Sequence, residues 1–114
     1  MAAKRIEQES QALADLIEAY KDNLLVAIFY AKWCDPCMDL LRFVLPAIAK
    51  QTGEEVVICP INIEEARNHS SSKKHGVMNV PVTLFIKEGK EVGRISGMIK
   101  IKGFMHEIKI HQKK

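Results

Sequence analysis

The sequence predicts an α/β fold with a mixed, mainly four-stranded sheet and helices on both of its faces. Short apolar runs typical of buried strands alternate with stretches in which apolar residues recur every three or four positions, as on one face of a helix. The patterns follow the order helix, strand, helix, strand, helix, strand, strand, helix. The first two strands are joined by a helical crossover and are expected to lie parallel, whereas the last two form a hairpin. Helices on both faces of the sheet give three layers.

The first half of the chain contains two helical patterns around one buried strand. Apolar residues over Ile6–Tyr20 predict the first helix. The continuous run LLVAIFY, Leu24–Tyr30, is short for a helix and fits a strand that is buried on both faces. A second helix is expected over residues 35–53, kinked or broken at Pro46, because proline cannot continue the helical hydrogen-bond ladder.

The second half of the chain predicts a strand, a weaker helix and a hairpin before the last helix. The strand covers Glu55–Ile63 and the weaker helix covers Glu64–Lys74. The hairpin strands are Val82–Ile86 and Glu91–Ile95, joined by the turn sequence KEGK. The last helix is marked by Ile101, Met105 and Ile108.

Length and composition place the chain among ordinary globular proteins. Its 114 residues suit one domain, which we expect to span residues 1–114. A net charge of +3 is too small to indicate a nucleic-acid partner. The first ten residues contain charges instead of an apolar signal segment, and no run approaches the roughly 20 apolar residues of a membrane span. We therefore expect a cytoplasmic protein that does not associate with a membrane.

The end of the chain is more basic than the rest. We interpret it as the solvated face of the last helix, with a binding surface as the alternative. The lysines concerned are Lys100, Lys102, Lys109, Lys113 and Lys114.

Two cysteines, Cys34 and Cys37, stand in the stretch AKWCDPCM, directly after a buried strand and at the start of a helix. Unpaired N–H groups and the helix dipole favour a thiolate in this position, and Pro36 suits a first helical turn. We expect Cys34 to be exposed and Cys37 to lie beneath it. The pair could be a redox centre, half of a zinc site completed by His69 and His75, or two ordinary small residues.

The stretch WCDPC resembles the WCGPC active site of the thioredoxin family. The segment LLVAIFYAK resembles the strand that leads into that site, and GVMNVPVTLFIKEGKEVGRISG resembles the family's cis-proline strand, hairpin and following glycine. The similarity extends from roughly Leu13 to Gly97, and the order of elements agrees with it. This context favours the redox interpretation and implies a thioredoxin-like fold.

The resemblance implies thiol–disulfide exchange with protein substrates. Cys34 is the attacking thiol, Cys37 resolves the mixed disulfide, and no metal or organic cofactor takes part. A thioredoxin-reductase-type electron donor restores the dithiol, and the protein is expected to be a monomer. The peptide bond between Val80 and Pro81 is expected to be cis, and Asn79 replaces a residue that is often small. The implied substrate-binding residues are Trp33, Asp35, Pro36, Asn79, Val80, Pro81 and Gly97.

The chain departs from the family pattern in the groups that control protonation of the thiols. The family's buried aspartate, six residues before the first cysteine, is replaced by Ile28, and Pro60 stands near the position of its lysine partner. Without that base the resolving step is expected to be slower. Asp35 brings a negative charge that opposes the Cys34 thiolate, which predicts a reductant rather than an oxidase.

Two further expectations follow from the early first helix and from the third cysteine. The family's usual first strand is expected to be missing, which leaves four strands. Cys59 lies in an apolar strand and is expected to be a core residue.

Two alternative functions are a thiol oxidase or isomerase of the same fold, and a redox-inert interaction subunit.

Overall fold

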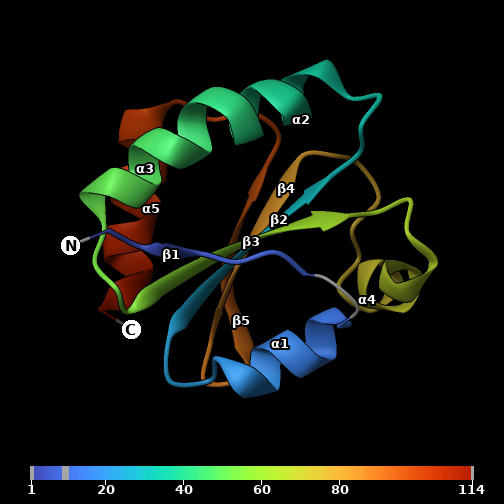
Figure 1. Ribbon diagram of the computed structural model, residues 1–114, viewed down its shortest axis with the longest axis horizontal. Coiled ribbons are helices and arrows are strands. Elements are labelled where there is room, and N and C mark those ends of the chain that lie inside the picture. The colour runs from blue at the N-terminus through green and yellow to red at the C-terminus, as the bar shows by residue number, and fades with distance from the viewer. Residues whose placement is uncertain (1, 9–10, 114) are drawn as a thin grey trace.

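The computed structural model describes residues 2–8 and 11–113, and these residues contain a mixed five-stranded sheet (Figure 1). The strand order is β1-β3-β2-β4-β5. The three strands β1, β3 and β2 run parallel, and β4 and β5 are each antiparallel to their neighbours. The strands are β1 (Lys4–Arg5), β2 (Leu24–Tyr30), β3 (Val56–Asn62), β4 (Val82–Lys87) and β5 (Lys90–Ser96).

Helices cover both faces of this sheet (Figure 1), as the sequence predicts. Helices α2, α3 and α5 lie on one face, and α1 and α4 lie on the other. A π-helical turn (Leu40–Val44) joins α2 to α3, and a 3₁₀ turn (Ala66–Asn68) precedes α4. The helices are α1 (Leu13–Ala19), α2 (Asp35–Asp39), α3 (Leu45–Gln51), α4 (His69–Lys74) and α5 (Ile101–Gln112).

The prediction of four strands is wrong, because β1 adds a short parallel strand at the edge of the sheet. Lys4 and Arg5 pair with β3, and the N–H of Ile6 donates to the carbonyl of Ile58 at 2.9 Å. Helix α1 consequently begins at Leu13 and not at Ile6. An edge strand of two charged, exposed residues has no apolar alternation, so the sequence pattern does not reveal it.

The helix expected over residues 35–53 runs from Asp35 to Gln51 without a break in the backbone, and a π-helical turn directly before Pro46 changes its hydrogen bonding. The N–H of Leu45 donates to the carbonyl of Leu40, five residues earlier, which is the π-helical hydrogen bond. Pro46 follows in the first turn of α3 and has no N–H to donate to the preceding turn. The π-helical turn separates α2, which contains Cys37 and is capped by Cys34, from α3.

Strand β2 is the central strand of the sheet and leads directly to the two cysteines. Six of its seven residues are buried, since helices cover it on both faces. Ile28 is fully buried, faces the α2–α3–α5 side of the sheet, and lies opposite Pro60 on β3 and Thr83 on β4. The position of the family's buried acid is therefore inside an apolar cluster.

Candidate active site

The two cysteines lie at the corner between β2 and α2 and are joined by a disulfide bond. Their Cα atoms are 5.2 Å apart. Cys34 has an extended backbone and caps the helix: its Sγ accepts a hydrogen bond from the N–H of Cys37 at 3.2 Å. This contact directs an N–H of the first helical turn at the sulfur of Cys34, so the same geometry would stabilise a thiolate in the reduced protein.

Cys34 is the more accessible of the pair, but less so than the sequence predicts. Its exposed fraction is 6%, and that of Cys37 is 0%. Tyr30, Ile63 and Val80 pack against the pair and leave only an edge of Cys34 at the surface. A protein disulfide can approach only a sulfur that is open to solvent. Cys34, and not the fully buried Cys37, is therefore the sulfur that such a disulfide can reach.

The Val80–Pro81 peptide bond is cis, and the carbonyl oxygen of Val80 lies 3.7 Å from the Sγ of Cys34. The structure thus brings together two segments that are 46 residues apart in the chain. The N–H of Gly97 donates to the carbonyl of Pro81 at 2.8 Å, and Gly97 has a φ of 89°, a backbone conformation that favours glycine. Asn79, Val80, Pro81 and Gly97 share one hollow of about 290 Å³.

The remaining predicted site residues lie on the helix side of the cysteines. Trp33 is 68% exposed, and Asp35 and Pro36 form the exposed first turn of α2. A large apolar ring that projects into solvent beside a reactive sulfur is suited to contact another protein.

Two residues near the site, Met78 and Tyr30, were not predicted from the sequence. Met78 is 89% exposed and lines the same hollow as Val80. Its position two residues before Val80 was the available signal. Tyr30 packs against the cysteines, and its pKa is raised by burial and then by the negative charges of Glu65 and Glu7. Tyr30 therefore stays a neutral phenol, and in the sequence it is only the last residue of an apolar run.

The third cysteine, Cys59, is a core residue, as predicted. It is 0% exposed in β3, and burial raises the pKa of its thiol to about 12. A thiol with so high a pKa carries very little thiolate at neutral pH and is a poor nucleophile. Among the described residues, the reactive sulfurs are therefore those of Cys34 and Cys37.

The zinc alternative would require the histidines to join thiolate ligands. Residues 2–8 and 11–113 contain no group of three or more His, Cys, Asp or Glu side chains placed to hold a metal ion. His75 instead has its Nδ1 atom 3.7 Å from a carboxylate oxygen of Glu91. The sulfurs that zinc would need are bonded to each other.

Over residues 2–8 and 11–113, no helix has the length and apolar character needed to cross a membrane.

The sequence and the structure of this chain were compared with those of known proteins, and both comparisons match the same family. A family model described as Thioredoxin matches residues 5–110. Thioredoxin from Bacillus subtilis is 32% identical over 71 residues, which are 62% of this chain and 65% of that protein. Thioredoxin 2 from Chlorobaculum tepidum is 29% identical over 100 residues, 87% of each chain. The crystal structure of Fasciola hepatica thioredoxin has a TM-score of 0.75 and 32% identity, covering 97% of this chain and 99% of that one.

The family match and the structural likeness both include the segment with the bonded cysteine pair and the segment with Pro81. The sheet order and the helices on both faces agree with the fold expected from the resemblance. The chain is a member of the thioredoxin family of thiol–disulfide oxidoreductases.

Proposed function

We propose that this chain, as a single domain of residues 1–114, reduces disulfide bonds in other proteins, with Cys34 as nucleophile and Cys37 as resolving thiol. The observation that carries the proposal is the Cys34–Cys37 disulfide at the start of α2, with the Val80 carbonyl 3.7 Å from Cys34. One reversible disulfide, one accessible sulfur and an adjacent backbone edge are what thiol–disulfide exchange requires.

The reaction begins with the reduced protein. The Cys34 thiolate attacks one sulfur of the substrate disulfide, a mixed disulfide forms, and the second substrate sulfur leaves and takes up a proton. Cys37 then loses its proton and attacks the Cys34 sulfur, which releases the first substrate sulfur. Two electrons pass to the substrate, and the Cys34–Cys37 disulfide remains. An external dithiol donor, such as a reductase of the thioredoxin-reductase type, returns two electrons and two protons.

The substrate segment is proposed to bind across the hollow beside Cys34. The backbone of Val80 would pair with it as with an added strand. The open hollow lined by Val80 and Gly97, next to the accessible edge of Cys34, supports this placement. The proposed substrate-binding residues are Trp33, Asp35, Pro36, Asn79, Val80, Pro81 and Gly97.

The direction of the reaction is proposed to be reducing. Asp35 stands in the first turn of α2 beside Cys34, and Asp39 adds a second negative charge to the same short helix. Negative charge destabilises a neighbouring thiolate, and a less stable reduced form makes the couple a stronger reductant. A reductant of this kind would act in a reducing compartment, so we propose that the protein is cytoplasmic. We also propose that it acts as a monomer.

The proposal is tested by turnover of a generic protein disulfide with dithiothreitol as the electron donor. The wild-type protein is expected to accelerate reduction well above the rate with dithiothreitol alone. An inactive wild-type protein whose cysteine pair can be reduced would contradict the proposal and would favour the redox-inert interaction subunit.

A further inference from the structure

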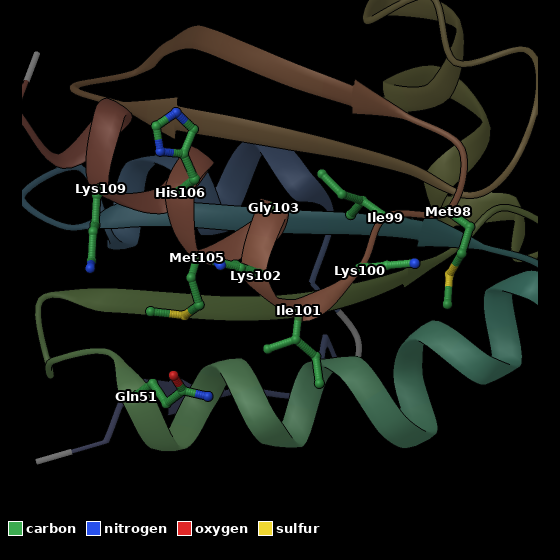
Figure 2. A pocket seen from close by; sticks show the side chains of 10 residues that line it. All are labelled: Gln51, Met98, Ile99, Lys100, Ile101, Lys102, Gly103, Met105, His106 and Lys109. Atoms are coloured by element: carbon green, nitrogen blue, oxygen red, sulfur yellow. The ribbon is translucent and has the colours of Figure 1, made fainter.

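A second and larger hollow lies between α3 and α5, on the face of the sheet that also carries α2. It is a groove of about 1100 Å³. Its apolar lining includes Met98, which is 48% exposed, and Ile101, which is 37% exposed. Figure 2 shows Ile101 and Met105 pointing from α5 toward α3, where Gln51 faces them. Apolar side chains left open to solvent in a groove of this size are suited to bind another chain.

The groove is also basic, which narrows the choice of occupant. Lys100, Lys102, Lys109 and His106 line it, and none of its ten lining residues carries a carboxylate. In Figure 2 the side chain of Lys109 points from α5 toward α3, on the same side as Met105. Three of the lysines that the sequence suggested to be a solvated helix face, Lys100, Lys102 and Lys109, therefore border an apolar groove. A segment that alternates acidic and apolar side chains complements this lining.

The groove continues from the proposed substrate site. Gly97 lines the hollow beside the cysteines, and the next residue, Met98, lines the groove between α3 and α5. The two hollows are thus lined by neighbouring residues, Gly97 and Met98, where a chain bound along Val80 would continue toward the groove. Along α5, the nine residues from Ile101 to Lys109 span eight helical steps, or about 12 Å, which is the length of about four residues of extended chain.

We infer that the groove between α3 and α5 binds an extended acidic and apolar segment of the disulfide-bearing protein substrate, close to the cysteine that Cys34 attacks. This inference rests on the proposed function, because it extends the same substrate site. A second copy of the chain is a poor occupant, since two copies of this face would bring lysines against lysines.

The inference is tested by measuring the binding of two fluorescein-labelled peptides. Both begin with serine in place of the substrate cysteine, followed by alternating leucine and glutamate in one peptide and alternating leucine and lysine in the other. At low ionic strength the wild-type protein is expected to bind the glutamate peptide about tenfold more tightly, with a preference that salt weakens. The doubly substituted Lys100→Glu/Lys109→Glu protein is expected to lose this preference.

The matched control is Lys73→Glu/Lys74→Glu on α4, on the opposite face of the sheet (Figure 1). It changes the net charge by the same amount and is expected to keep most of the preference. Equal losses in the two substituted proteins, or no preference in the wild type, would overturn the inference.

The reduction of a small disulfide, 5,5′-dithiobis(2-nitrobenzoate), is measured in parallel to separate the two proposals. A protein that reduces this reagent without preferring the glutamate peptide leaves the proposed function intact and overturns the inference. Groove-dependent peptide binding in a protein that reduces no disulfide would overturn the proposed function, and with it the assignment of the segment to a substrate.

Discussion

Replacing Cys34 by serine is expected to abolish protein-disulfide reduction, with turnover falling by at least about a thousandfold, because no other described residue supplies an accessible nucleophilic sulfur. Cys37→Ser is expected to stop the reaction one step later. Cys34 still attacks, but no second thiol releases the substrate, so a mixed disulfide accumulates. Turnover of a protein disulfide and intact-mass spectrometry of the products check both expectations.

Cys59→Ala is the matched control for these two substitutions. It removes a sulfur that is fully buried and protonated, and it is expected to retain turnover. A mixed disulfide that accumulated on Cys37 in the Cys34→Ser protein would reverse the assigned roles, and full activity of that protein would contradict the mechanism.

Ile28→Asp is expected to have opposite effects on stability and on the resolving step. Ile28 is 0% exposed and lies in the same apolar cluster as Leu40, which follows Cys37 by one helical turn. Burying a carboxyl there is expected to lower the free energy of unfolding by about 3–5 kcal/mol. The carboxyl restores the base that the family usually has at this position, so release of the substrate from the mixed disulfide is expected to be about tenfold faster.

Urea unfolding measures the stability change, and single-turnover decay of the mixed disulfide measures the resolving rate. Ile28→Asn is the matched control, because it has nearly the same shape as the aspartate variant and cannot accept the thiol proton. The hydroxyl of Thr83, directly opposite on β4 and buried, is available to hydrogen-bond either new side chain. An unchanged resolving rate in Ile28→Asp would mean that another group already takes the proton from Cys37.

Much of the fold and the centre of the site could be predicted from the sequence because their signals are strong and local. The run LLVAIFY can be buried on both faces only as a central strand, and β2 occupies that position. Cys34 and Cys37 followed this strand directly, which placed them at a helix start whatever the details of packing. Pro46 indicated the irregular hydrogen bonding between α2 and α3 because proline lacks the N–H that a regular helix needs.

The parts that escaped prediction depend on tertiary contacts. β1 is defined only by its pairing with β3, since two charged residues carry no strand pattern of their own. The low exposure of Cys34 results from Tyr30, Ile63 and Val80, which come from three separate segments. In the sequence, Lys100, Lys102 and Lys109 were indistinguishable from a solvated helix face, because only the packing of α5 against α3 places them beside an apolar groove.

The reduction potential of the Cys34–Cys37 couple tests the central claim, that this chain is a disulfide reductase, most directly. It is measured by equilibrating the protein with defined ratios of reduced and oxidised dithiothreitol and quantifying the free thiols of the pair. The negative charges of Asp35 and Asp39 in α2 lead us to expect a value of about −270 mV or below. A value between about −180 and −120 mV, in the range of disulfide isomerases and disulfide-forming enzymes, would contradict the account.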